Sequence, residues 1–173
     1  GNVRFIGPNC LGIISTYDKL NASFGGDLPN EGGTCYISQS GALLAAILDM
    51  ANAQGIGLSK LISIGNKADL NELDIIEAMD NDPNTKVIAG YLESIDDGNM
   101  FARVAEQISN RKPILLIKAG STAAGAQAAS SHTGSLAGGD TAYEAVFAKS
   151  GIIRCKSISQ QFNYARAFSN QPL

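Results

Sequence analysis

Short apolar runs of strand length alternate along this sequence with segments that have the spacing of helices. The runs Val87-Ile88-Ala89 and Ile114-Leu115-Leu116-Ile117 are nearly continuous, as in strands covered on both faces. Between them, Met100, Val104 and Ile108 recur every four residues, as on one side of a helix. This alternation predicts parallel βαβ units. We therefore expect an α/β fold, a flavodoxin-like doubly wound sheet of five parallel strands with helices on both faces.

The same pattern predicts where the individual elements lie. We expect strands over residues 33–37, 61–64, 87–92, 114–118 and 152–155. We expect helices over residues 42–54, 72–79, 99–109, 140–149 and 158–169.

The two ends of the sequence differ from its middle. Residues 1–31 show weak periodicity and are punctuated by prolines, glycines and asparagines. We expect them to connect an upstream domain to this one, with room for a short strand around residues 3–6. The regular pattern predicts the domain itself over residues 32–156. Residues 157–173 are expected to form a closing helix and a linker to a further domain.

The composition excludes several classes of function. With 173 residues, the chain is long enough to bury the core of one domain. Its net charge of −3 gives no basic surface of the kind that binds nucleic acid. No apolar run approaches the length of a membrane span, so we expect no membrane contact.

The three cysteines, Cys10, Cys35 and Cys155, form no Cys-x-x-Cys pair, and the single histidine cannot complete a usual zinc site. We therefore expect no metal site. Buried free thiols are typical of a reducing compartment, which predicts a cytoplasmic protein. Cys35 and Cys155 lie in apolar, strand-like runs, whereas Cys10 lies in a turn-like run at residues 7–12.

Polar residues follow the first two predicted strands, and the carboxyl ends of parallel strands face the ligand crevice. The run Ser38-Gln39-Ser40-Gly41-Ala42 leads into a helix, where hydroxyls and free N–H groups can hold an anion. An ordinary serine N-cap with a tight turn explains the same residues equally well. After the next strand, Asn66 and Lys67 could contact a ligand, and Asp69 is expected to cap the following helix.

The next two strand ends bring a carboxylate and a histidine to the same edge. Glu93 follows the third predicted strand, and His132 lies in a long, small-residue loop, 119–138, after the fourth. The imidazole of His132 can act as a base, a nucleophile or a metal ligand near neutral pH. Glu93 could hydrogen-bond its far nitrogen and so fix the tautomer. A solvated glutamate and a loop histidine with a satisfied hydrogen bond are the plain alternatives.

Signatures of several other enzyme classes are missing from the sequence. There is no Gly-x-Ser-x-Gly elbow of a serine hydrolase. No Walker-type or Gly-x-Gly-x-x-Gly motif follows a predicted strand.

Six short stretches, taken together, resemble a known family. They run in order over nearly the whole chain, at residues 4–12, 38–43, 55–60, 65–69, 91–93 and 131–138. Their sequences include RFIGPNCLG, SQSGAL, GNKAD and SHTGSLAG. In these motifs the chain resembles the succinyl-CoA synthetase-like ligase domain of NDP-forming acyl-CoA synthetases, and within that superfamily the ADP-forming acetyl-CoA synthetase type.

The resemblance implies an acid–thiol ligase that interconverts acyl-CoA, ADP and phosphate with acid, CoA and ATP. An acyl phosphate forms first, His132 then carries the phosphoryl group, and Glu93 steadies the imidazole. The residues implied in phosphate binding are Ser38, Gln39, Ser40, Gly41, Ala42, Thr133 and Gly134. The residues implied on the CoA and acyl side are Asn9, Cys10, Asn66 and Lys67.

The resemblance also implies partners. Residues 1–31 would be the linker from a missing CoA-binding domain, and a nucleotide-binding ATP-grasp domain or subunit would complete the enzyme. CoA, ADP or ATP, and Mg²⁺ belong to that complete enzyme, so none is expected to be bound in this piece alone. A small-molecule acid or acyl-CoA is the expected substrate, and the family commonly pairs such domains, which allows a homo-oligomer.

Two other interpretations are open. Related regions occur fused to protein acetyltransferases, where they would sense acyl-CoA or another ligand without turnover. The chain could also be a flavodoxin-like interaction domain with no site of its own, in which case replacing His132 would change local stability only.

Overall fold

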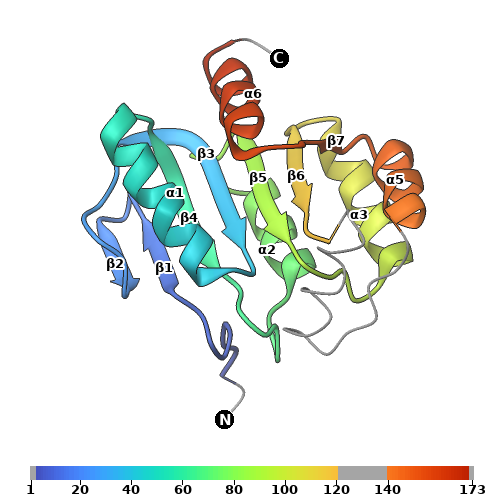
Figure 1. The fold of residues 1–173 in the computed structure, drawn as a ribbon, viewed down its shortest axis with the longest axis horizontal. Helices are drawn as coiled ribbons and strands as arrows, with labels where there is room; N and C mark the ends of the chain where they lie inside the picture. Colours follow the sequence, from blue (N-terminus) through green and yellow to red (C-terminus); the bar gives the residue numbers. More distant parts are fainter. Residues whose placement is uncertain (1–2, 121–139, 172–173) are drawn as a thin grey trace.

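The computed structural model describes residues 3–120 and 140–171, which form one mixed, seven-stranded β-sheet with helices on both faces (Figure 1). The sheet order is β2-β1-β4-β3-β5-β6-β7. The parallel strands are β3 (Glu31–Ser38), β4 (Leu58–Ser63), β5 (Val87–Leu92), β6 (Ile114–Lys118) and β7 (Ile153–Arg154). Because the chain enters the middle of this group and winds outward both ways, the predicted flavodoxin-like order is confirmed.

Two further strands extend the sheet beyond the predicted five. β1 (Gly12–Ser15) and β2 (Leu20–Ser23) form a hairpin, and β1 pairs antiparallel with β4. The predicted strand around residues 3–6 is wrong, since those residues adopt no regular secondary structure. Part of the segment expected only to connect domains therefore widens the sheet, which makes it mixed instead of purely parallel.

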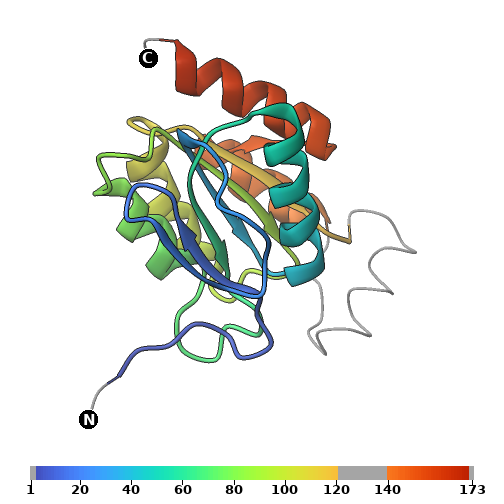
Figure 2. The ribbon, with the colours of Figure 1, turned by 90° about the vertical axis from the view of Figure 1, so that its left-hand side faces the viewer.

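Helices of both predicted layers cover the sheet. Figures 1 and 2 show α1 (Gly41–Gln54) and α6 (Ile158–Asn170) on one face, and α2 (Glu72–Asp80) and α3 (Gly98–Ser109) on the other. The fifth described helix, α5 (Asp140–Lys149), packs beside α3 through Phe147, which lies 6.4 Å from Phe101 between ring centroids. None of the helices in the described part of the chain is long and apolar enough to cross a bilayer.

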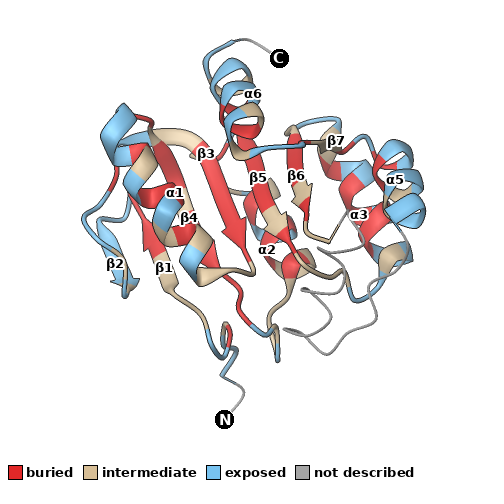
Figure 3. Ribbon diagram, viewed as in Figure 1, coloured by how far each residue is buried: buried red, intermediate tan, exposed pale blue. Residues whose placement is uncertain are grey.

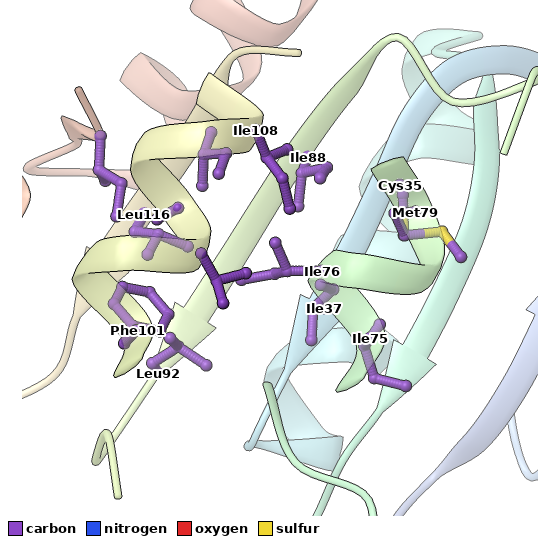
Figure 4. Close-up of a cluster of buried hydrophobic side chains, with 14 of the residues drawn as sticks. Cys35, Ile37, Ile75, Ile76, Met79, Ile88, Leu92, Phe101, Ile108 and Leu116 are labelled. Carbon is purple, nitrogen blue, oxygen red and sulfur yellow. The ribbon is translucent and has the colours of Figure 1, made fainter. Parts of the chain in front are cut away.

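Alternation along the central strands divides the core into two layers. In β3, Cys35 and Ile37 face α2 and α3, whereas Tyr36 faces α1 and α6. The central strands are almost entirely buried in Figure 3, as a sheet covered on both faces requires. One layer, drawn in Figure 4, includes Ile37, Ile75, Ile76, Met79, Ile88, Phe101, Ile108 and Leu116. The other includes Tyr36, Leu44, Ile47, Leu48, Leu61, Ala89, Leu115 and Phe162.

The element bounds agree closely with the periodicity. Strands 87–92 and 114–118 and helix 140–149 have the predicted ends, and the other elements differ by one to three residues at an end. The prediction that Asp69 caps α2 is wrong. Asn71 is the N-cap, because its side chain accepts from the amides of Leu73 and Asp74 while Asp74 bonds back to the amide of Asn71.

Candidate functional site

The loops that follow three neighbouring parallel strands, β3, β4 and β5, meet at one edge of the sheet. Figure 1 shows the arrowheads of β3 and β5 pointing toward this edge. A pocket of about 670 Å³ lies there, which is the position expected for a ligand in a doubly wound sheet. Its described lining is Asn9, Cys10, Leu11, Phe24, Gln39, Ser40, Gly41, Ala42, Gly65, Asn66, Lys67, Glu93, Ser94 and Asp96.

Most of the candidate residues from the sequence meet in this pocket. Ser38 does not line it, and His132, Thr133 and Gly134 lie outside the described residues. Sequence reasoning missed Phe24, a residue that is 92% exposed at the pocket. A single phenylalanine in a weakly periodic segment carries no signal for a site. The candidate residues that do line the pocket are Asn9, Cys10, Gln39, Ser40, Gly41, Ala42, Asn66, Lys67 and Glu93.

The turn from β3 into α1 shapes the first wall. Ser38 is fully buried, and its hydroxyl accepts from the amide of Ser40 at 3.0 Å and donates to the carbonyl of Ser40 at 2.8 Å. Ser40 is the N-cap of α1, with its Oγ accepting from the amide of Leu43 at 3.2 Å. The serine N-cap interpretation is thereby confirmed for Ser40.

The same turn leaves the start of α1 suited to an anion. Amides in the first turn of a helix have no carbonyl partner within the helix, and Gly41 and Ala42 supply two of them here. The first turn of α1 contains no acidic side chain, so the partial positive charge at this end is not neutralised from within the helix. Ser40 can therefore cap α1 while the amides of Gly41 and Ala42 bind an anion.

The N-terminal segment forms the second wall by running along the β4–α2 loop. The amide of Asn66 donates to the carbonyl of Pro8 at 3.0 Å, and the amide of Ala68 donates to the carbonyl of Gly7 at 2.9 Å. These bonds bring Asn9 close to Asn66, with the two side-chain amides 3.5 Å apart. Asn9, Cys10 and Asn66, predicted for the CoA and acyl side, consequently share this wall.

Asp69 fastens this segment to the loop. Its carboxylate accepts from the amide of Phe5 at 2.8 Å and from Nε of Arg4 at 2.7 Å. The Phe5 amide, helped by the Arg4 guanidinium, lowers the pKa of the Asp69 carboxyl. Asp69 therefore fastens Arg4 and Phe5, at the start of the segment that leads to the pocket, instead of capping α2.

Lys67 lies at the pocket but directs its charge into the protein. Its Nζ lies 3.0 Å from Glu72, 2.9 Å from Asp96 and 3.2 Å from the carbonyl of Ser94. The side chains of Lys67 and Glu72 are 4% and 1% exposed. An ammonium has three donors, and these contacts use all three, so Lys67 ties the β4–α2 loop to the β5–α3 loop.

Glu93 is the first residue after β5 and is half-buried at the pocket. Burial raises the pKa of the neighbouring Tyr91 hydroxyl, and the negative charge of Glu93 raises it further. Across residues 3–120 and 140–171, no group of three or more histidine, cysteine, aspartate or glutamate side chains is placed to share a metal ion. The pocket thus combines helix-end amides with two carboxylates, Glu93 and Asp96, of which Asp96 is paired with Lys67. Such a set can bind an anion and stabilise a nearby cation.

Comparison with known proteins identifies the family. A model of the succinyl-CoA ligase-like flavodoxin domain matches residues 31–168. The chain is 49% identical to an ADP-forming acetate–CoA ligase of Methanocaldococcus jannaschii, covering 99% of this chain and 24% of that protein. It is 46% identical to the alpha subunit of ADP-forming acetate–CoA ligase I of Pyrococcus furiosus, covering 98% of this chain and 37% of the subunit.

A solved structure agrees with these matches. A dinucleotide-forming acetyl-coenzyme A synthetase 1 from Ca. Korarchaeum cryptofilum, in complex with phosphate and ADP, superposes with a TM-score of 0.94 at 46% identity. The match covers 98% of this chain and 37% of that one, so the chain spans only a part of the proteins it resembles. The resemblance inferred from the motifs is confirmed, and the chain belongs to the succinyl-CoA ligase-like flavodoxin domain family, homologous to ADP-forming acetate–CoA ligases.

Proposed function

We propose that this chain is the phosphoryl-transfer domain of an ADP-forming acyl-CoA synthetase. The observation that carries the proposal is the meeting of the α1 N-terminus and Glu93 at one pocket, on the edge where the loop containing His132 leaves β6. The related synthetase solved with phosphate and ADP supports the same class of chemistry.

Phosphate binding is assigned to the start of α1. The Gly41 and Ala42 amides point along the helix axis, and together with the helix dipole they favour a dianion over a neutral group. Ser40 fixes the first turn by its bond to Leu43, so the amides are oriented before the anion arrives.

The proposed chemistry uses His132 as a nucleophile. Phosphate oxygen attacks the thioester carbonyl of acyl-CoA, and the CoA thiolate leaves, which gives an acyl phosphate. A neutral nitrogen of His132 then attacks phosphorus, and the P–O bond breaks as the carboxylate of the free acid departs. A terminal oxygen of ADP finally takes the phosphoryl group, which forms ATP and returns the imidazole.

Glu93 acts on the charge of this intermediate. A phosphorylated imidazole that keeps its second proton is cationic, and a carboxylate at the far nitrogen stabilises it. Phosphoryl transfer depends mainly on positioning and charge stabilisation. The main contribution required of Glu93 is therefore a carboxylate held in a fixed position.

The remaining substrates are assigned to the second wall, formed by the N-terminal segment and the β4–α2 loop, and to other domains. Asn9, Cys10 and Asn66 face the side where the acyl-CoA thioester would enter, and Lys67 supports that wall through its ion pairs. A CoA-binding domain and an ATP-grasp domain or subunit would supply the CoA, nucleotide and Mg²⁺ sites.

The test is phosphorylation of His132 in the complete synthetase. We expect Mg-ATP to label the wild type with phosphate that is labile in acid and stable in base, and His132→Asn to stay unlabelled. Glu93→Gln should label about 10- to 100-fold more slowly, because it loses a positioned charge. Glu77→Gln, which changes an exposed carboxylate on α2, is the matched control and should label at the wild-type rate.

Two results would contradict the proposal. The first is a folded, complete wild type that takes up no label. The second is label that persists in His132→Asn. The first result would favour a ligand-sensing domain without turnover, and the second would assign the phosphoryl group to another residue.

A further inference from the structure

Two backbone amides of the turn that begins at Glu93 donate to the side chain of Gln39, the first residue after the neighbouring strand β3. The carboxamide oxygen of Gln39 accepts from the amide of Glu93 at 2.6 Å and from the amide of Ser94 at 3.0 Å. Nε2 of Gln39 lies 3.4 Å from Oγ of Ser94. We propose that Gln39 is a positioning residue, which fixes Glu93 relative to the anion-binding start of α1.

These contacts extend the β-sheet beyond the end of its strands. β3 and β5 pair in register as far as Ser38 and Tyr91. The amide of Gln39 then donates to the carbonyl of Tyr91 at 3.1 Å, and the carboxamide oxygen takes the next two amides of the β5 chain. Beyond the ends of the two strands, the side chain of Gln39 thus takes the place of the β3 backbone as the hydrogen-bond partner of the residues that follow β5.

The chemistry of the carboxamide favours positioning over phosphate binding. The Oε1 of Gln39 is an acceptor with two lone pairs, and the amides of Glu93 and Ser94 use both of them. These bonds hold the carboxamide with its donor, Nε2, 3.4 Å from Oγ of Ser94. We therefore assign the Gln39 side chain an indirect role, through Glu93, in the phosphate site. This role rests on the proposed function, because it requires Glu93 to act on the phosphorylated imidazole.

The far end of the same turn is held separately. Nζ of Lys67 bonds to the carbonyl of Ser94 and to the carboxylate of Asp96, and the amide of Asp96 donates to Glu72 at 3.3 Å. Loss of Gln39 therefore frees the Glu93 peptide while the rest of the turn stays anchored. A substitution of Gln39 should change the direction of the Glu93 side chain without unfolding the loop.

The first experiment measures the contact itself, by hydrogen exchange of single amides in Gln39→Met. Methionine keeps the length of the side chain and removes the acceptor. We expect the Glu93 and Ser94 amides to exchange at least about 10-fold faster, because each loses its partner. Gln160→Met is the matched control, since Gln160 also accepts from a backbone amide, that of Lys156, but lies outside the pocket.

A second variant guards against misfolding. Gln39→Glu keeps an acceptor oxygen and is expected to keep both amides protected. Unchanged exchange of both amides in a folded Gln39→Met, or lost protection in a folded Gln39→Glu, would overturn the contact as the cause.

The second experiment asks whether Gln39 acts through Glu93, by a double-mutant cycle on the rate of His132 phosphorylation in the complete synthetase. We expect Gln39→Met to slow labelling by about 10- to 100-fold, the usual cost of a small misplacement of a catalytic group. In a Glu93→Ala background, the same substitution should cost less than about 2-fold. A merely structural role would slow both backgrounds equally, and that result would overturn the proposal.

The His132→Asn variant separates this inference from the function on which it rests. If His132→Asn takes up no label and Gln39→Met labels at the wild-type rate, the positioning role alone is overturned. Label that persists in His132→Asn would overturn both.

Discussion

The ammonium of Lys67 lies 3.0 Å from the carboxylate of Glu72, and the two side chains are 4% and 1% exposed. A buried pair of this kind makes the loss of one partner costly, because the other charge stays buried alone. We expect Lys67→Met to lower the free energy of unfolding by about 3–5 kcal/mol, measured by urea denaturation. Lys67→Met combined with Glu72→Gln should lose less than Lys67→Met alone.

The chain offers a matched control for this pair. Lys19 also has a left-handed backbone, with φ of 53° against 54° for Lys67, and also pairs with a glutamate, Glu31. Its ion pair is exposed, so Lys19→Met should cost less than about 1 kcal/mol. If Lys19→Met and Lys67→Met lower the free energy of unfolding equally, burial does not determine the cost of breaking these ion pairs.

Asp82 predicts a pH dependence of stability. Burial alone would raise the pKa of its carboxyl, but bonds from Lys60, Thr85 and the Asn84 amide outweigh burial and lower the pKa below its ordinary value of 3.8. A lowered folded-state pKa stabilises the protein above the unfolded value and loses that contribution as the pH falls through the folded value. The stabilisation by Asp82 should therefore be complete at neutral pH and disappear progressively below about pH 4.

The measurement compares Asp82→Asn with the wild type in urea at several pH values. We expect a loss of about 1–3 kcal/mol at pH 7, which shrinks as the pH falls below about 4. Asp49→Asn, at an exposed position of α1, is the control. A difference between wild type and Asp82→Asn that stays constant down to pH 2 would argue against this linkage.

Three glycines separate backbone strain from steric clash. Gly65 has φ of +53°, and a Cβ there would lie 2.3 Å from the carbonyl oxygen of Pro8. Gly55 has φ of +63° with open space around it, and Gly26 has neither restriction. We expect Gly26→Ala to be neutral, Gly55→Ala to cost about 1 kcal/mol, and Gly65→Ala to cost more, measured by thermal unfolding. Gly65→Ala no worse than Gly55→Ala would show that the Pro8 segment can move away.

A buried glutamine joins α6 to the sheet. Nε2 of Gln161 donates to the carbonyls of Gly90 and Leu115 at 2.9 and 2.8 Å, and Oε1 accepts from the hydroxyl of Tyr36 at 2.6 Å. Gln161→Met should cost about 1–3 kcal/mol in urea denaturation, because it leaves the buried Tyr36 hydroxyl without a partner. Adding Tyr36→Phe should recover part of the loss. An additive double variant would show that the two side chains do not interact.

The sequence predicted the five parallel strands because their apolar runs are set by burial on both faces. The β1–β2 hairpin was not predicted, and its outer strand β2 lies at the sheet edge with a partner strand on one side only. Leu20–Ser23 is almost wholly exposed, and the alternation that marks a half-buried strand is absent. An edge strand of this kind depends on the neighbouring strand, here β1, more than on its own residues.

The residues of the pocket could be predicted better than their contacts. Strand ends in a parallel sheet converge by topology, so Gln39, Asn66 and Glu93 were placed at one edge from the order of elements alone. Which atoms they bond depends on side-chain geometry between residues more than fifty positions apart, as for Gln39 and Glu93. Lys67 is predicted as a ligand contact because it follows a strand end. Its ion pair with the buried Glu72 carries no sequence signal, since Glu72 starts a helix, a position that is usually exposed.

The position of β3 in the sheet has a consequence for partly unfolded forms of the protein. β3 is the middle strand of the seven, so losing β2 at one edge or β7 at the other leaves it paired on both sides. Edge strands open at lower free energy than central ones. The backbone that supports Gln39 and Ser40 should therefore be among the last parts of the chain to unfold. Proteolytic cleavage in an edge strand should leave β3 folded.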